Sequence, residues 1–448
     1  MSDQQLNPPY VEVGQPSFSS NLDLFTDPLL ATGVEKCFYT ELWPNAPLSD
    51  TSTTITFDLE GGPCYLDLVN SYVFLTIKVL NNDNSAIPAY TAEASVGTIN
   101  APLATCFRDL EIRVNDVGIS STYGTYAYTS MFQLLLNYSH SAIETKLSLM
   151  GFNRDTNPNE NDAFGSISGF KERAARTALS ANYSMMGPIL GHYFHSINRY
   201  FMNMTKISWT WLKNTSDFCL KSNVNNANFK YSIQDMRMYI RKVQLYPSQL
   251  MKLENQLASQ NAKYPLCHYY TKEITVPAAA RFHHFTNILS SQFIPKRCIL
   301  ALVAQSNFIG EQSNSPFAFQ PFNLTDAYFS SDNKRYPSQP FNLNFNAGTD
   351  QDWTRGYFSL FKNGNFRAND GPFCVQYNEY PRFMFLAFYF QEEENSGEFF
   401  TEKKIGSVTL TLKFGTNNNP TLKCLLYIEN QEVLEVTQKR FLVRNFEL

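Results

Sequence analysis

The sequence predicts an all-β protein made of two tandem jelly-roll β-sandwiches, with short helices between the strands. Aromatic residues make up 15% of the 448 residues, with 37 Phe and 25 Tyr, and aromatic side chains favour strands. Many short segments alternate apolar and polar residues, and long loops join them. The order strands, helix, strands occurs twice, offset by roughly 190 to 230 residues, which indicates two similar domains.

The joint between the domains is predicted at residues 229–265. The strand alternation there slips at Asp235 and again before Val243. Each slip would turn the buried face outward unless a β-bulge absorbs one residue. Pro247 then stops the strand and can begin a helix. Three leucines recur at helical spacing after it, and extended chain restarts at the pair Tyr264-Pro265 (the leucines are Leu250, Leu253 and Leu257).

Four parts of the chain are therefore expected. Residues 1–35 form a flexible N-terminal arm, because they are polar, rich in Pro and Ser, and lack periodicity. Residues 36–246 form the first jelly roll, with a long insert at 140–197. Residues 247–264 form a linker helix, and residues 265–448 form the second jelly roll.

Strands are expected wherever apolar residues alternate or run continuously. In the first half these segments are 55–59, 65–80, 110–114, 199–202 and 207–212. In the second half they are 268–276, 297–305, 323–329, 383–390, 408–414, 422–428 and 433–436. Helical spacing predicts one helix between strands in each half, around 128–135 and 353–361, and a further short helix at 171–179.

Charge and hydropathy exclude several classes of function. The chain has 36 Lys and Arg against 40 Asp and Glu, so its net charge of -4 gives no overall reason to bind nucleic acid or an anionic membrane. Its longest apolar runs, 298–304 and 383–390, are far shorter than the roughly 20 residues that cross a bilayer. The N-terminus, MSDQQLNPPY, lacks the apolar core of a signal peptide, so we expect no secretion and no membrane span.

The eight cysteines are scattered and form no CxxC pair. Several, such as Cys298 and Cys424, lie inside apolar strand segments. Thiols in this setting act as small apolar core residues. We therefore expect reduced thiols in a protein made inside a cell, and no disulfide framework.

No catalytic, cofactor-binding or metal-binding residues are predicted. Two histidine pairs, His192/His195 and His283/His284, have no carboxylate or cysteine near them at a spacing that would complete a zinc site, so a structural role is expected. Glu392-Glu393-Glu394 is predicted to be a solvated turn, although crowded carboxylates can also act on glycosides. Phosphate-loop and nucleophile-elbow motifs are missing from the sequence, so no cofactor is expected.

Two basic clusters are candidate nucleic-acid contacts. Lys171, Arg173 and Arg176 lie on the short helix of the insert, but Glu172 dilutes their charge. Pro295-Lys296-Arg297 precedes a strand and is predicted to be its solvated start. Neither cluster indicates a specific nucleic-acid site.

Several segments, in this order and spacing, resemble one known family. They are Tyr65-Leu66-Asp67-Leu68, 110–120, 126–128, 134–138, 236–245, 263–265, 294–297, 314–319 and 357–361. Together they resemble the double jelly-roll, hexon-like major capsid proteins of Polinton/Maverick-type elements and adintovirus-like DNA viruses. The insert at 140–197 matches this family least.

The resemblance implies a structural protein and not an enzyme. It implies a homotrimer with a pseudo-hexagonal outline that contacts neighbouring trimers, together with penton and minor capsid proteins, in an icosahedral virion. From its polar, aperiodic composition we hypothesise that the N-terminal arm lies beneath the shell and ties capsomers together. The low charged fraction of 17% agrees with a surface that neighbouring chains cover. Two alternatives remain at this point: a two-domain β-sandwich carbohydrate-active enzyme, and a lectin-like binding module.

Overall fold

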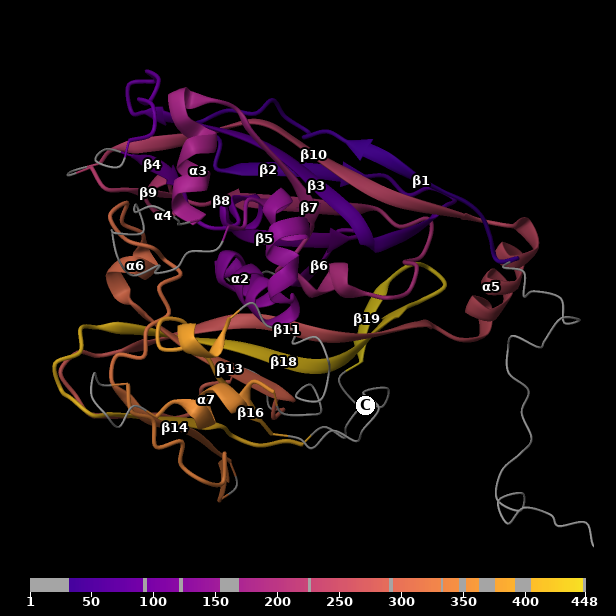
Figure 1. Cartoon of the computed structure of the whole chain (residues 1–448). Coiled ribbons are helices and arrows are strands. Elements are labelled where there is room, and N and C mark those ends of the chain that lie inside the picture. The colour runs from indigo at the N-terminus through magenta and orange to yellow at the C-terminus, as the bar shows by residue number, and fades with distance from the viewer. Residues whose placement is uncertain are drawn as a thin grey trace, which may run out of the picture.

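The computed structural model of the chain describes residues 32–91, 95–120, 124–153, 169–224, 227–289, 293–331, 333–345, 352–361, 375–390 and 404–445. The predicted all-β character is confirmed, because these residues form several antiparallel sheets with a few short helices. Figure 1 shows two layered bodies, one above the other. The upper body contains the earlier strands, and the lower body contains the later ones.

Two four-stranded sheets form the upper body. Sheet I has the order β1-β10-β3-β7, and sheet II has the order β2-β8-β5-β6. A small pair, β4 (Val96–Thr98) and β9 (Leu220–Ser222), lies beside them. Strand bounds in sheet I are Val34–Leu42 (β1), Phe229–Leu245 (β10), Tyr65–Asn81 (β3) and Tyr183–Pro188 (β7); in sheet II they are Thr54–Leu59 (β2), Ile207–Lys213 (β8), Phe107–Val114 (β5) and Val117–Ser120 (β6).

Two further sheets form the lower body. Sheet III has the order β11-β18-β13-β16, with β19 also paired to β18, and sheet IV has the order β12-β17-β14-β15. Strand bounds in sheet III are Ala262–Val276 (β11), Leu422–Val436 (β18), Arg297–Ala304 (β13), Leu386–Tyr389 (β16) and Leu442–Asn445 (β19); in sheet IV they are Phe282–Phe285 (β12), Thr409–Phe414 (β17), Leu324–Ser331 (β14) and Lys334–Tyr336 (β15).

The helices are short and lie between strands or at their ends. Their bounds are Pro102–Thr105 (α1), Tyr126–Asn137 (α2), Gly169–Thr177 (α3), Ser216–Cys219 (α4), Pro247–Ser259 (α5), Gln305–Ile309 (α6) and Thr354–Ser359 (α7). No helix among the described residues is long and apolar enough to cross a membrane.

β10 contains register shifts near both of the predicted phase slips. Its register with β3 shifts between Ile233 and Asp235, and again between Tyr239 and Arg241. Without these shifts, the residues after each slip would point to solvent. The predicted bulge at Asp235 is therefore confirmed, whereas at the second shift the extra residues lie in β3, between Asp67 and Tyr72. The core residues of β10 are Ile233, Met236, Met238, Ile240 and Val243.

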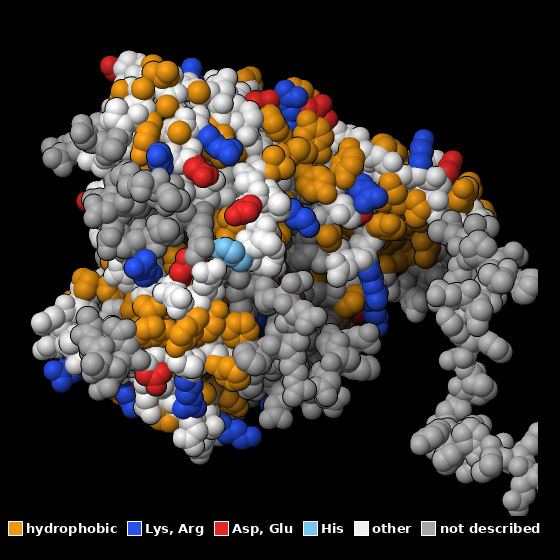
Figure 2. All heavy atoms as spheres, in the orientation of Figure 1, with side chains coloured by type: hydrophobic (Ala, Val, Ile, Leu, Met, Phe, Trp, Pro, Cys, Tyr) orange, Lys and Arg blue, Asp and Glu red, His pale blue; other side chains and the backbone are white. Residues whose placement is uncertain are grey.

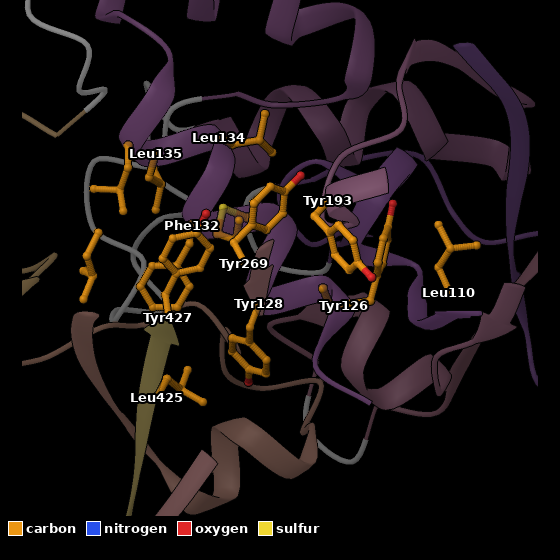
Figure 3. Close-up of a cluster of buried hydrophobic side chains, with 14 of the residues drawn as sticks. Leu110, Tyr126, Tyr128, Phe132, Leu134, Leu135, Tyr193, Tyr269, Leu425 and Tyr427 are labelled. Atoms are coloured by element: carbon orange, nitrogen blue, oxygen red, sulfur yellow. The ribbon is translucent and has the colours of Figure 1, made fainter. Parts of the chain in front are cut away.

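α2 is wedged between the two bodies (Figure 1). Its Phe132 ring stacks on Tyr427 of β18 with 5.4 Å between the ring centroids. The hydroxyl of Thr125 donates to the backbone oxygen of Thr271 in β11 at 2.8 Å, and the Thr129 hydroxyl donates to the Thr271 hydroxyl at 2.8 Å. Figure 3 shows Phe132 and Tyr427 close together within a cluster of buried side chains. One continuous hydrophobic core therefore runs through both bodies.

The turn between β18 and β19 reaches back to the upper body. Its Arg440 donates from Nη2 to Oδ1 of Asn203 at 2.9 Å and to Oε1 of Glu254 in α5 at 2.6 Å. The side-chain amide of Asn115, in the turn that joins β5 to β6, donates to the Arg440 backbone oxygen at 2.8 Å. The C-terminal hairpin thus fastens both the upper body and α5 to sheet III.

Three sequence predictions about the upper body need correction. The insert at 140–197 is not wholly a loop, because β7 lies inside it and pairs with β3. Residues 199–202 form no strand; Phe201 makes only an isolated bridge to Leu66. β1 was not predicted as a strand, and it begins at Val34, inside the arm predicted for residues 1–35. Residues 1–31 of that arm lie outside the described residues.

Two predictions farther along the chain also change. The linker helix predicted at 247–264 ends at Ser259, and Lys263 and Tyr264 pair with β18 as part of β11. The two strands predicted at 422–428 and 433–436 are one strand, β18. The polar residues between them stay in the strand because Glu429 forms an ion pair with Arg297 and Glu432 lies 3.1 Å from His268, each in a neighbouring strand.

Candidate functional surfaces

The structure places the six histidines in separate surroundings. His195 is buried, and its Nε2 accepts a hydrogen bond from Nε1 of Trp209 at 3.0 Å. Its Nδ1 lies 3.2 Å from the backbone oxygen of Leu68. An indole N–H only donates, so Nε2 must be the acceptor and Nδ1 the donor, which fixes a neutral imidazole. Burial lowers the pKa of His195 to about 4.

The other histidines have mainly structural contacts. Nδ1 of His192 accepts from the backbone N–H of Phe194 at 3.2 Å. His268 lies 3.1 Å from Glu432 across two strands. His283 contacts the backbone oxygen of Ala280, His284 contacts the hydroxyl of Thr411, and His140 lies in a 3-10 turn. Within the described residues, no three His, Cys, Asp or Glu side chains gather as metal ligands would.

The two basic clusters do not form cationic surfaces. Arg173 is buried and donates to the backbone oxygens of Thr98 and Asn153 at 2.9 and 3.1 Å. The prediction that Arg297 lies in a solvated strand start is wrong, since it makes a two-pronged ion pair with Glu429 at 2.7 and 2.5 Å. That pair joins β13 to β18, and Arg297 is half-buried. The acidic run Glu392 to Glu394 lies outside the described residues.

The seven cysteines among the described residues are all free thiols. Cys106, Cys219, Cys298 and Cys424 are buried, as expected for core thiols. Burial raises the pKa of the Cys298 and Cys424 thiols, which keeps them protonated and unreactive.

The outer face of sheet I is rich in aromatic side chains. The strand register places Tyr239, Tyr72 and Pro188 in one row, and Phe74 and Met186 in the next. The surface continues onto β1 through Tyr39, which contacts Tyr72, and onto Trp43, the residue that follows β1, which contacts Arg237. We call this surface the aromatic face; it consists of Tyr39, Trp43, Tyr72, Phe74, Met186, Pro188 and Tyr239.

Charged side chains on the aromatic face are paired with one another. Arg237 lies 4.1 Å from the Trp43 ring centroid and bonds to Glu41 at 3.0 Å and to Asp235 at 2.7 Å. Arg241 bonds to Asp67 at 3.1 Å. A second protein could therefore cover this face without leaving these charges unpaired, which is the main cost of burying charge. Figure 2 shows hydrophobic and charged side chains interspersed where β1, β3 and β10 run.

β1 is exposed on both sides although it is an ordered edge strand. Residues 35–39 are all exposed, and β1 pairs only with β10. Trp43, directly after β1, is 56% exposed, and Tyr39 is 49% exposed. An uncovered edge strand with aromatic side chains invites pairing or packing with another chain.

The outer face of sheet II provides a contrast within the same body. Its rows across the sheet are polar: Thr56, Thr210 and Glu111 in one, and Asp58, Ser208 and Arg113 in the next. The inner faces of the same strands are fully apolar, for example Trp209 and Trp211. Sheet II therefore follows the usual rule of an apolar inner face and a polar outer face. The aromatic face of sheet I departs from that rule, which makes it the candidate functional surface.

Four antiparallel sheets in two stacked sandwiches define the class of fold as a double jelly roll. Comparison with solved structures agrees. The chain is similar to a chain of the Sputnik virophage, with a TM-score of 0.64 and 12% identity over 96% of this chain and 93% of that one. It is similar to the mavirus major capsid protein (TM-score 0.55, 11% identity, 100% and 96% covered). It is also similar to the Faustovirus major capsid protein (TM-score 0.56, 9% identity, 92% of each chain).

At these identities the likeness shows the fold, and the predicted double jelly roll is confirmed. No protein-family model matches the chain. By sequence it is 21% identical over 291 residues to an uncharacterized protein of Caenorhabditis elegans. That match covers 63% of this chain and 66% of the nematode protein, slightly less than two thirds of its length.

Proposed function

We propose that the chain is a structural major capsid protein, which self-associates to build the shell of a virion. The observation that carries the proposal is the double jelly roll, since the similarity to chains of virophage and large DNA virus capsids covers nearly the whole length of both partners. Two polar contacts among the described residues also support a structural role. His195 bonds to Trp209, and Arg297 bonds to Glu429, so both side chains hold neighbouring segments together.

The finer assignment rests on the sequence resemblance. The unit of assembly is a homotrimer with a pseudo-hexagonal outline. The virion is of the Polinton/Maverick or adintovirus-like group. Penton and minor capsid proteins complete the shell. The part of the N-terminal arm that precedes β1 contributes contacts between capsomers, and the linker helix α5 joins the two jelly rolls.

The aromatic face is the surface that we assign to contact between copies. It is apolar, internally charge-paired and continuous with the exposed strand β1. Aromatic residues and Arg are enriched at protein interfaces, and they supply most of the binding energy there. A second copy of the chain is the occupant that a self-assembling shell requires.

Electron microscopy of the purified full-length protein tests the proposal. At high protein concentration we expect compact hexagonal particles that associate into sheets or shells. Isolated two-lobed particles at every concentration would contradict a capsid role and would favour a binding module or an enzyme.

A further inference from the structure

A groove of about 630 Å³ lies beside α5, at the end of the molecule where the chain passes from the upper to the lower body (Figure 1). Its apolar lining comes from elements far apart in sequence: Tyr65, Met202, Leu245, Leu253, Leu257 and Tyr264. Leu253 of this lining is 39% exposed. The volume falls in the range of sites that bind a ligand or a short peptide.

The polar lining suits the backbone of a peptide. Gln249 and Gln256 of α5, and Gln260 directly after it, line the groove with side-chain amides. An amide side chain both donates and accepts hydrogen bonds, as a peptide backbone does. An apolar floor with amides along one wall therefore fits an extended segment with apolar side chains.

The charged lining is cationic. Arg199 and Lys263 are the charged residues among those that line the groove, and Arg199 donates to the Lys263 backbone oxygen at 2.6 Å. Neither has a carboxylate partner within the part of the chain that the structure describes. A ligand with acidic side chains would complement both.

The N-terminal segment of the chain has these properties and starts at the groove. Gly33 and Val34, near the beginning of the described chain, line the groove themselves. Residues 21–30, just before them, read NLDLFTDPLL: five large apolar residues with Asp23 and Asp27 and no basic residue. Leu30 is three residues from Gly33, so it lies within about 11 Å of the groove wall even in a fully extended chain.

We infer that residues 22–30 of each chain bind in the groove beside α5 of the same chain. The leucines and Phe25 cover the apolar floor, the glutamines bind the segment's backbone, and the two aspartates face Arg199 and Lys263. Docking buries apolar surface that the groove now exposes. It also fixes the point from which residues 1–21 leave the subunit. This inference goes beyond the capsid role and does not depend on it.

Photo-cross-linking in the full-length protein tests the inference. A benzophenone-bearing phenylalanine analogue replaces Phe25, and mass spectrometry locates the product. We expect cross-links to α5 or to residues 262–264 within one chain. The same analogue at Phe18, outside the segment, is the matched control and should give no such product. Cross-links that join two copies, or that lie elsewhere on the molecule, would overturn the assignment.

Charge reversal provides a second, independent test. Lys263→Glu should lower the yield of the Phe25 cross-link by about threefold, as expected for one partly exposed ion pair. Lys252→Glu, on the exposed part of α5 and outside the groove, is the matched control and should leave the yield unchanged. Adding Asp27→Lys to Lys263→Glu should restore the yield. Equal losses with both single variants would contradict the charge pairing.

The outcome is distinguishable from failure of the capsid proposal. A monomeric protein that forms the internal cross-link would contradict the capsid role and leave the groove assignment in place. An assembled shell without the cross-link would contradict the groove assignment and leave the capsid role in place.

Discussion

His195 shows how a single buried side chain makes the upper body sensitive to acid. Because its pKa falls from 6.5 to about 4 on folding, the unfolded chain binds a proton between these pH values and the folded chain does not. Stability from this group is therefore fully present above pH 6.5 and is lost as the pH falls toward 4. At 1.36 kcal/mol per pH unit, the loss approaches about 3 kcal/mol.

Urea unfolding at pH 7 and pH 4.5 tests this effect. His195→Gln keeps a neutral polar side chain but cannot titrate in this range. The wild-type protein should lose about 2 kcal/mol more stability than the variant between the two pH values. Parallel losses in the two proteins would show that His195 is not held neutral by its contacts with Trp209 and Leu68.

At the scale of elements, sequence patterns predicted strands well where burial alternates regularly. The slips in β10 could be found from sequence because side chains in a strand alternate with a period of two. One extra residue therefore breaks the alternation of apolar and polar residues. β7 was missed because its pairing with β3 joins residues about a hundred positions apart, as in Thr76 and Ser184. β18 was divided in two because Glu429 and Glu432 look solvent-exposed until their partners Arg297 and His268 are placed.

The aromatic face could not be predicted from sequence for a related reason. Its residues come from four strands, and each strand taken alone shows only an apolar or mixed outer side. The nearly continuous apolar run from Tyr65 to Leu80 does predict a strand that is covered on both faces. Only the register brings Tyr72, Tyr239 and Tyr39 together as one surface.

Substitution of Trp43 tests the aromatic face directly. Trp43→Glu removes the aromatic ring that lies over Arg237 and should leave the fold intact, because the tryptophan is 56% exposed. Loss of one aromatic anchor should weaken self-association by at least 2 kcal/mol, roughly 30-fold in the apparent Kd. The measurement is sedimentation velocity across a concentration series. Thr210→Glu on the polar face of sheet II is the matched control, and equal effects of the two variants would contradict the assignment.

At the scale of the whole molecule, two jelly rolls share one hydrophobic core. α2 fills the space between them, and Arg440 fastens the C-terminal hairpin to Asn203 and to Glu254 of α5. These contacts suit an assembly of many copies, because modest contacts between subunits add up only if each subunit presents its surfaces in the same arrangement. The low overall charge and the aromatic face both indicate a molecule whose surface neighbouring copies cover.

The mass of the purified full-length protein in solution tests this account most directly. Light scattering at micromolar concentration should give a particle of about three times the 51.2 kDa chain mass. A particle of one chain mass at every concentration tested would contradict the central claim that this protein is built to associate with copies of itself.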